Sequence, residues 1–306
     1  MHDAVAADVD RGHFRHGLFA AVLLAVLCSA LAWGLHRLVP TATQAPLSSP
    51  PVRIVSLSPG ITETLFAIGA GDRVVAVSDY CAYPPPVREL PRAGTAITPQ
   101  YERIARLNPD LIVTQTTQRS AAPELDGLGP TERLPWLELD EIAKSTLRLG
   151  ELTGRQAQAA ALADRLLTSL SKPPPPAAPR VLLVLGYAGT RLSEVWFVRD
   201  NSLHGAALRA ARARNAVPEA VAGLPRMSLE RVLEIDPDQI IVLSSKPLDA
   251  SATRQVLEAW RGLPSLAAVE HGRIGVIDAE GALANGPRIL DFVERLRALI
   301  GELATR

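Results

Sequence analysis

Short aliphatic runs alternate with segments of helical periodicity from about residue 52 to the end of the chain. Such alternation favours helices layered on mainly parallel sheets. The runs that predict strands are 53–56, 74–77, 111–114, 134–139, 181–185, 239–243 and 273–277. The segments that predict helices are 61–68, 101–107, 141–152, 202–211, 229–234, 252–260 and 287–304. The pattern therefore predicts an α/β fold.

The first of these helices has a recognisable start and end. Ser58 stands in an N-cap position with Glu63 nearby, and Pro59 follows where the first turn of a helix tolerates proline. The sequence Gly69-Ala70-Gly71 lacks the third glycine and the preceding strand of a dinucleotide-binding loop. We therefore interpret it as the turn that ends this helix.

Residues 155–171 form a stretch of good helix formers between the two halves of the chain. The prolines at 173–176 end this stretch, because proline cannot continue the hydrogen-bond ladder of a helix. A lone helix of about 17 residues is about 25 Å long and would act as a strut. We expect an N-terminal lobe over residues 52–152, a bridging helix over 155–171 and a C-terminal lobe over 180–306.

One segment occurs twice, once in each half. Residues 101–113 read YERIARLNPDLIV, and residues 229–242 read LERVLEIDPDQIIV. A helix that ends in Pro-Asp before a strand is a common connection, but two copies in register indicate duplicated lobes. The corresponding pairs are Glu102 with Glu230, Pro109 with Pro237, and Asp110 with Asp238.

The first 51 residues differ from the rest. Residues 18–35 carry no charge, and a run of this length is just able to cross a bilayer. One interpretation is a cleavable secretory signal with a small-x-small site at Ala30-Leu31-Ala32. The other is a retained membrane anchor, which the length of the run and Trp33 at its far edge favour. A proline-rich linker follows over residues 40–51, and both interpretations place the body of the chain outside the cytoplasm.

Composition narrows the classes of partner. Basic and acidic residues are equal at 32 each, with no long run of either sign, so neither a nucleic-acid partner nor a polybasic membrane contact is indicated. Cys28 and Cys81 offer neither a disulfide framework nor a metal-ligand spacing. Cys28 is better explained as an apolar residue than as a lipidation site, since Leu27 stands where such signals have a small residue.

Motifs of catalysis are absent. The sequence contains no Gly-x-Ser-x-Gly, His-Glu-x-x-His, P-loop or Cys-x-x-Cys motif, so we predict that the protein is no enzyme. His204 and His271 are the only histidines of the body and lie far apart in sequence, so we predict no metal site. His204 stays open as an axial haem ligand, against the alternative of an ordinary surface histidine.

The run RIVSLSPGITETLFAIGAGDRVVAVSDYCAYPP at residues 53–85 resembles the N-terminal lobe of substrate-binding proteins of ABC importers for cobalamin, siderophores and haem. The resemblance continues to the C-terminus through ERI…NPDLIV at 102–113, SLERV at 228–232 and GPR at 286–288. It implies two Rossmann-like α/β lobes bridged by a single long helix, with the ligand cleft between them, preceded by an N-terminal hydrophobic signal or anchor helix. In this family a glutamate on each lobe docks onto arginines of the permease subunits, and Glu102 and Glu230 match these positions.

The resemblance also implies residues that contact the ligand. Tyr80 and Trp196 match cleft aromatics of cobalamin-binding members, and flat aromatic faces suit a large macrocycle. Arg191 and Arg288 could pair with an anionic group of the ligand. The predicted ligand-binding residues are Ser58, Pro59, Tyr80, Tyr187, Arg191, Trp196, Glu280 and Arg288.

Several positions depart from the cobalamin-binding members. Ala96 and Leu224 stand where those proteins have cleft tryptophans, and Ala284 stands where an arginine accompanies the acid that corresponds to Glu280. Arg212-Ala213 stands where the family has Gly-Gly. The ligand therefore stays open between cobalamin, haem and a ferric siderophore, and no cofactor of the protein itself is implied.

We expect an extracytoplasmic solute-binding component, in the periplasm or at the outer face of the cytoplasmic membrane, held there by residues 18–35 if they are retained. It would capture a corrinoid or iron complex and deliver it to an ABC permease. The alternative is a membrane-tethered ligand sensor or interaction module that uses the same fold without transport. The candidate anchor and the departures at ligand positions motivate that alternative.

Overall fold

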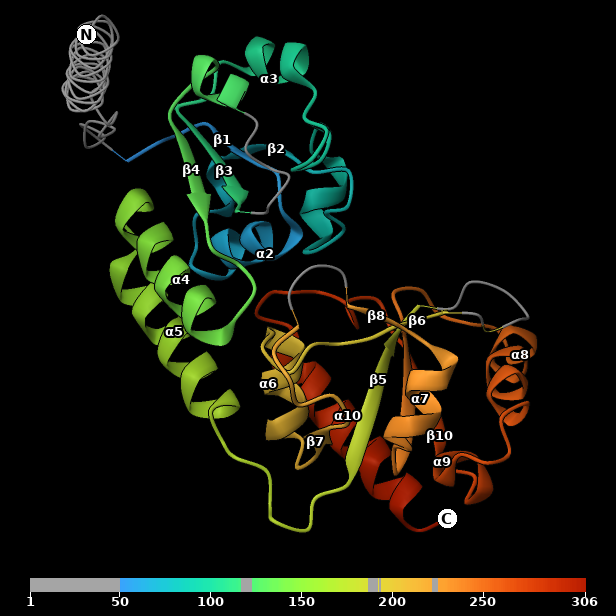
Figure 1. The fold of residues 1–306 in the computed structure, drawn as a ribbon. Coiled ribbons are helices and arrows are strands. Elements are labelled where there is room, and N and C mark those ends of the chain that lie inside the picture. Colours follow the sequence, from blue (N-terminus) through green and yellow to red (C-terminus); the bar gives the residue numbers. More distant parts are fainter. Residues whose placement is uncertain (1–49, 117–122, 187–191, 193, 222–224) are drawn as a thin grey trace, which may run out of the picture. The chain divides into compact units, whose positions relative to one another are not determined.

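The computed structural model describes residues 50–116, 123–186, 192, 194–221 and 225–306 (Figure 1). The apolar run 18–35 lies outside these residues. Within the described ranges, no helix combines the length and the apolar character that a membrane span requires.

The first half of the described chain holds a four-stranded parallel sheet in the order β2-β1-β3-β4. Its strands are β1 Ile54–Ser56, β2 Val74–Val77, β3 Leu111–Gln115 and β4 Thr131–Leu134. The helices are α2 Pro59–Ala67, α3 Tyr101–Leu107 and α4 Leu139–Thr153, with the 3₁₀ helices η1 Gly71–Arg73, η2 Pro85–Glu89 and η3 Pro123–Gly127. All residues of β1 are buried, which is the pattern of an inner strand in a parallel sheet covered on both faces.

The second half holds another four-stranded parallel sheet, in the order β10-β9-β5-β7, and a two-stranded antiparallel sheet of β6 and β8. Its strands are β5 Arg180–Leu185, β6 Glu194–Trp196, β7 Arg214–Asn215, β8 Arg226–Ser228, β9 Gln239–Ser244 and β10 Ile274–Asp278. The helices are α6 Leu203–Ala210, α7 Leu229–Ile235, α8 Ala250–Arg261, α9 Ala267–Glu270 and α10 Ile289–Ala304. The predicted α/β class with parallel sheets is confirmed.

The strand predicted over 134–139 is wrong. The strand at this place is β4, which pairs with β3 over Thr131–Leu134 and lies at an edge of its sheet. Its sequence TERL is too polar to stand out in an apolar pattern. The apolar residues that follow it lead into α4, and Trp136 is buried there outside any strand.

The helix predicted over 155–171 is observed as α5, Gln156–Leu170, but it is not isolated as a lone strut would be. Gly154, with a φ of 67°, turns the chain from α4 into α5. The two helices then pack so closely that a Cβ on Gly150 would lie 2.4 Å from the Cβ of Ala159. After α5, residues 171–179 lead into β5 (Figure 1).

A continuous buried cluster joins the two halves through α5. It includes Ile61 and Leu65 of α2, Leu166 of α5, and Leu203 and Phe292 of the second half. Helix α5 is therefore packed against both halves, whereas residues 171–177, which follow it, are exposed or half-buried.

Candidate functional site at the carboxyl ends of the two sheets

The duplicated segment folds the same way in both halves. Helices α3 and α7 each end at a residue with a positive φ, which is 43° at Asn108 and 42° at Asp236. A Pro-Asp pair follows each of them and leads into an inner strand of its sheet, β3 or β9. Asparagine and aspartate tolerate the left-handed conformation better than most residues, so the sequence supports this helix end in both copies.

The aspartate of each pair holds the neighbouring strand. Asp110 Oδ2 accepts hydrogen bonds from the amides of Val52 and Arg53, each at 3.0 Å. Asp238 Oδ2 accepts one from the amide of Arg180 at 2.7 Å. These contacts tie the segment to the first strand of its own half.

An arginine completes each copy, which the sequence comparison of 101–113 with 229–242 did not reveal. The Arg53 guanidinium donates to the carbonyl of Leu107 at the end of α3, at 2.7 and 2.9 Å. The Arg180 guanidinium donates to the carbonyls of Ile235 and Asp236 at the end of α7. Arg53 directly precedes β1 and Arg180 is the first residue of β5, so the repeat extends to the start of the first strand in each half.

The two glutamates of the repeat occupy equivalent, accessible positions. Glu102 and Glu230 are the second residues of α3 and α7, and both are exposed. Glu102 approaches Arg106 at 3.4 Å on its own helix, in a pair that solvent screens. A hydrogen bond with Ser228 lowers the pKa of Glu230. Their docking role stays a prediction.

The predicted ligand-binding residues differ in accessibility. Tyr80, in the loop after β2, is 74% exposed, and Trp196, at the end of β6, is 40% exposed. Ser58 is buried, and its hydroxyl donates to Gln115 Oε1 at 3.2 Å. Pro59 is the first residue of α2, as predicted from the helix start. Tyr187 and Arg191 lie outside the described residues, as does Leu224.

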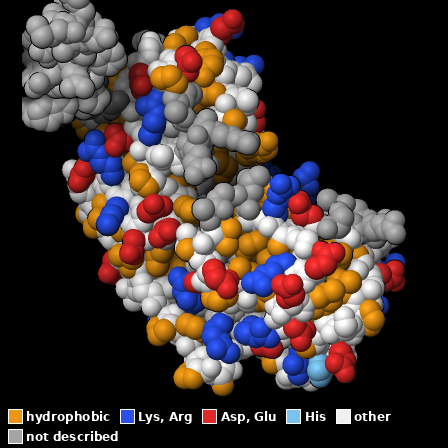
Figure 2. All heavy atoms as spheres, in the orientation of Figure 1, with side chains coloured by type: hydrophobic (Ala, Val, Ile, Leu, Met, Phe, Trp, Pro, Cys, Tyr) orange, Lys and Arg blue, Asp and Glu red, His pale blue; other side chains and the backbone are white. Residues whose placement is uncertain are grey.

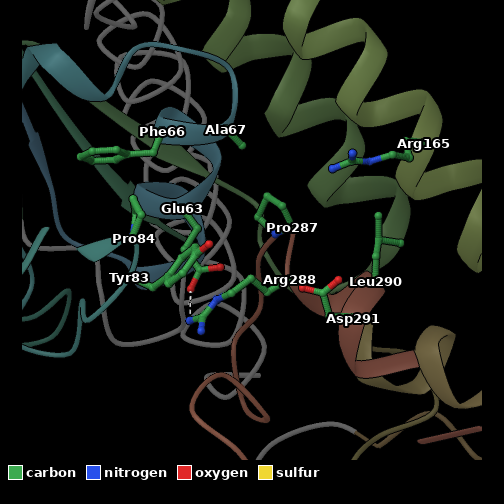
Figure 3. A pocket seen from close by; sticks show the side chains of 10 residues that line it. All are labelled: Glu63, Phe66, Ala67, Tyr83, Pro84, Arg165, Pro287, Arg288, Leu290 and Asp291. Carbon is green, nitrogen blue, oxygen red and sulfur yellow. Dashed lines mark hydrogen bonds and ion pairs between the residues drawn. The ribbon is translucent and has the colours of Figure 1, made fainter. Parts of the chain in front are cut away.

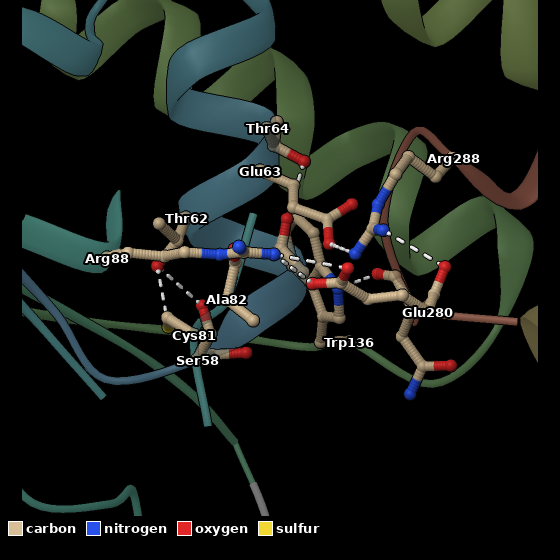
Figure 4. Close-up of polar contacts among 12 residues, drawn as sticks. Ser58, Thr62, Glu63, Thr64, Cys81, Ala82, Arg88, Trp136, Glu280 and Arg288 are labelled. Carbon is tan, nitrogen blue, oxygen red and sulfur yellow. Dashed lines mark hydrogen bonds and ion pairs between the residues drawn. The ribbon is translucent and has the colours of Figure 1, made fainter. Parts of the chain in front are cut away.

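Loops at the carboxyl ends of strands in the first sheet contact loops after β10 of the second sheet (Figure 4). Trp136, beyond β4, donates its indole N–H to the carbonyl of Asn285 at 2.7 Å. Gly60, beyond β1, permits this approach, since a Cβ there would lie 2.2 Å from the same carbonyl oxygen. Ligand sites of parallel α/β sheets form at such carboxyl ends.

Arg288 lies at the centre of this junction. Its Nη2 donates to Glu63 Oε1 at 2.5 Å, its Nη1 donates to the carbonyl of Glu280 at 3.3 Å, and its guanidinium lies 4.1 Å from the ring centroid of Tyr83. The side chain of Arg288 is 19% exposed and that of Glu63 is 4% exposed. The structure thus places Arg288 in a contact between the halves, while its predicted role with the ligand is not tested.

A second, more exposed ion pair spans the same junction. Arg88 Nη2 donates to both carboxylate oxygens of Glu280, at 2.8 and 3.1 Å, and Arg88 Nε donates to the carbonyl of Ala82 (Figure 4). The sequence indicated Glu280 but gave no sign of Arg88. The two residues are 192 positions apart, and nothing in the spacing relates them.

A cavity of about 440 Å³ lies beside this junction (Figure 3). Residues of both halves and of α5 form its wall, which mixes aromatic, aliphatic and charged side chains. The lining residues are Glu63, Phe66, Ala67, Tyr83, Pro84, Arg165, Pro287, Arg288, Leu290 and Asp291. Its volume falls within the range of ligand pockets, but neither Tyr80 nor Trp196 lines it.

His204 is not the surface histidine that the sequence offered as one alternative. Its side chain is buried in α6, Nε2 lies 2.9 Å from the carbonyl oxygen of Ala282, and its ring meets that of Phe292 edge to face. Burial lowers the pKa of His204. These contacts leave Nε2 engaged with the backbone, which argues against an axial haem ligand. In the described part of the chain, no group of three or more His, Cys, Asp or Glu side chains could hold a metal ion.

Cys81 is a free, buried thiol, and burial raises its pKa. Its Sγ lies 3.2 Å from the hydroxyl of Thr62, within the core of the first half. It therefore serves packing at the base of the loop that carries Tyr80.

Neither sign of charge dominates the described residues on the face that is in view. On the face drawn in Figure 2, side chains of both signs are interspersed over the described residues. This distribution agrees with the balanced composition and gives no basic track for a nucleic acid.

The two parallel α/β sheets thus meet at their carboxyl ends, which is where proteins of this fold class bind ligands. Residues 54–280 match the family described as periplasmic binding protein, and the chain belongs to that family.

Named relatives bind cobalamin or haem. A vitamin B12-binding protein of Vibrio cholerae is 31% identical over 265 residues, which cover 81% of this chain and 88% of the relative. The crystal structure of the periplasmic vitamin B12-binding protein of Vibrio cholerae has a TM-score of 0.67 at 26% identity and covers 84% of this chain and 99% of that one. A periplasmic haem-binding protein from Pseudomonas aeruginosa has a TM-score of 0.67 at 25% identity, with 82% and 92% covered. All three are named as binding proteins, two for vitamin B12 and one for haem.

Proposed function

We propose that this protein is the extracytoplasmic solute-binding component of an ABC importer and carries a corrinoid or an iron complex to the permease. The observation that carries the proposal is the meeting of the carboxyl ends of two parallel sheets, at Trp136 with Asn285 and Arg88 with Glu280. This is the place where parallel α/β folds bind ligands. The relatives that bind cobalamin or haem support the same class of ligand.

The binding step is reversible capture with no covalent chemistry. The exposed rings of Tyr80 and Trp196 offer flat apolar area to a macrocycle or an aromatic chelator, with little loss of side-chain entropy. Tyr187 and Arg191, which follow β5 in the sequence, complete the proposed ligand set together with Ser58 and Pro59, while Glu280 and Arg288 form the ion pairs of the adjoining junction.

Delivery requires contact with the permease. Glu102 and Glu230 carry their carboxylates on equivalent helices of the two halves, and both side chains are exposed. Two separated negative charges fix the orientation of a docked complex better than one, because like-charge mismatches are penalised in every other pose. Export and retention at the outer face of the membrane would rest on residues 18–35.

Titration of the purified protein with cyanocobalamin, haem and ferric siderophores tests the proposal, with intrinsic tryptophan fluorescence as the readout. Among the tryptophans of the described residues, Trp136 and Trp260 are almost completely buried, whereas Trp196 is 40% exposed, so we expect the ligand-dependent quench in this part of the chain to come mainly from Trp196. A Trp196→Phe variant should lose most of that quench. Absence of a saturable signal with every ligand, confirmed by calorimetry, would exclude the capture function.

A further inference from the structure

The two ion pairs that span the junction differ in their environment. In the inner pair, Glu63 and Arg288 have side chains that are 4% and 19% exposed. In the outer pair, Glu280 and Arg88 have side chains that are 49% and 57% exposed. Breaking a buried ion pair leaves an uncompensated charge without water, whereas an exposed pair separates at little loss because water solvates both ends.

We therefore expect the inner pair to stay formed when a ligand binds. Arg288 is held by Glu63, by the ring of Tyr83 and by the carbonyl of Glu280. The backbone at Gly286 also lies against the Glu63 side chain. No residue larger than glycine fits at position 286 without a shift, since a Cβ there would lie 2.8 Å from Glu63 Oε2. A ligand that needed Arg288 would have to displace all three partners.

The outer pair has the opposite character. Arg88 keeps one donor, Nε, on the carbonyl of Ala82, so its position is fixed by the loop that also carries Tyr80. Its Nη2 holds Glu280, and its Nη1 makes no hydrogen bond to any of the residues that the structure describes. Arg88 can thus exchange Glu280 for another carboxylate without losing its anchor, and a guanidinium binds a carboxylate through two parallel hydrogen bonds.

We propose that Arg88 is a specificity-determining residue of the ligand site and selects ligands with a carboxylate at their periphery. The ligand carboxylate takes the place of Glu280 on Arg88, while the pair of Glu63 with Arg288 keeps the halves joined. The released Glu280 is half-exposed and stays solvated beside Arg295, with which it lines a cavity of about 190 Å³. This inference rests on the proposed function and narrows its ligand to an anionic complex.

Haem and haem dimethyl ester form a matched pair of probes, because they share the macrocycle and the iron and differ in the two carboxylates. We expect Arg88→Gln to weaken haem binding about tenfold, the lower end for a charge-assisted hydrogen bond, and to leave the ester unaffected. Glu280→Gln should strengthen haem binding, since the competing carboxylate is removed. Arg148→Gln is the control, because Arg148 is half-exposed like Arg88 and also pairs with carboxylates, those of Glu132 and Glu151, but takes no part in the junction.

The outcomes separate the two proposals. Unchanged haem affinity in Arg88→Gln, or an equal loss for haem and its ester, overturns the role of Arg88. Tight binding of cyanocobalamin without any binding of haem overturns the proposal that the ligand carries a carboxylate, but it is consistent with the carrier function. Failure of the unmodified protein to bind haem, cyanocobalamin or a ferric siderophore overturns the carrier function and this inference together.

Discussion

Arg212 adopts a backbone conformation that residues with a side chain rarely take, with a φ of 71° just after Ala211, the C-cap of α6. Helices commonly end with glycine at this position, because only glycine enters the left-handed region without a steric penalty. The side chain of Arg212 is exposed, so the arginine gains little from packing in return. The penalty at this position is therefore not offset locally.

We expect Arg212→Gly to raise the free energy of unfolding by about 1 kcal/mol. Glycine removes the steric penalty in the folded protein, and this gain exceeds the loss that comes from the greater flexibility of glycine in the unfolded chain. For a chain of this size such a gain corresponds to an increase in Tm of about 2–4 °C. Thermal unfolding followed by circular dichroism measures it. Arg212→Ala is the control, since alanine removes the same side chain but keeps the Cβ, and it should leave Tm nearly unchanged.

Single residues show what sequence patterns can and cannot reveal. The sequence located Ser58, Pro59 and the turn at Gly69 correctly, because caps and turns depend on neighbouring residues. It could not find Arg88, since its partner Glu280 becomes a neighbour only after both sheets have formed. It also left His204 as a surface residue or a ligand, because a single histidine carries no periodic signal of burial.

Helix α6 contains a histidine that should make folding sensitive to acid. His204 is buried against Phe292 of α10, and burial lowers its pKa in the folded protein. The unfolded chain therefore takes up a proton more readily than the folded chain does as the pH falls below about 6.5. Proton binding then favours the unfolded state, so the contribution of His204 to stability is complete above that pH and is lost on acidification.

We expect the urea concentration at the unfolding midpoint of the unmodified protein to decrease when the pH is lowered from 7.5 to 5. In a His204→Gln variant the decrease should be smaller. Glutamine retains a side-chain amide that can donate to the carbonyl of Ala282, but it does not titrate in this range. Because carboxylates also titrate at low pH, the measured quantity is the difference between the two slopes. Equal slopes would refute a role for His204.

At the level of elements, prediction succeeded where the local pattern and the tertiary environment agree. Helix α3 was predicted with its observed bounds, Tyr101–Leu107, because a helix start, a helical period and a Pro-Asp end coincide there. Strands β6, β7 and β8 were not predicted, since each has only two or three residues and begins with a charged one, whereas the equally short β1 lies in an aliphatic run. The edge strand β4 was misplaced for a related reason, as its polar sequence follows from having only one neighbouring strand.

The molecule as a whole depends on the contacts between its two halves, which lie far apart in sequence. The sequence repeat predicted that each half contains the same helix–Pro-Asp–strand unit, and the observed hydrogen bonds of Asp110 and Asp238 agree with this. Nothing in the repeat indicated how the halves contact one another. That information lies in single polar residues after the strands, such as Glu63 and Trp136, whose partners no local pattern identifies.

We expect Glu63→Gln to lower the free energy of unfolding by about 3 kcal/mol, because it leaves the poorly solvated Arg288 without a compensating charge. Glu280→Gln should change it by less than about 1 kcal/mol, since the pair with Arg88 is half-exposed. Urea titration of both variants at pH 7 measures the contrast. Equal losses of stability in the two variants would show that the inner and outer ion pairs contribute equally to the free energy of unfolding, despite their different burial.

Transport itself tests the duplicated glutamates. If Glu102 and Glu230 dock onto a permease, the Glu102→Ala, Glu230→Ala double variant should lose uptake of the ligand while its affinity for the ligand is unchanged, because both carboxylates are solvent-exposed helix residues outside the ligand junction. Each single variant should retain partial uptake, since one charged contact remains to orient the complex.

The matched control replaces two other exposed glutamates, Glu151 of α4 and Glu302 of α10, each of which forms an ion pair with an arginine close by in the sequence. The control removes the same net charge, so it separates a specific docking contact from a general loss of electrostatic steering. Electrostatic steering weakens as salt increases, so a defect in uptake that comes from lost steering should disappear in about 0.5 M salt with a saturating concentration of the carrier. A defect that comes from a lost docking contact should remain under these conditions. The docking assignment would be contradicted if uptake fell equally in both double variants, or if ligand affinity fell together with uptake. The duplicated segment would then have a role in folding only.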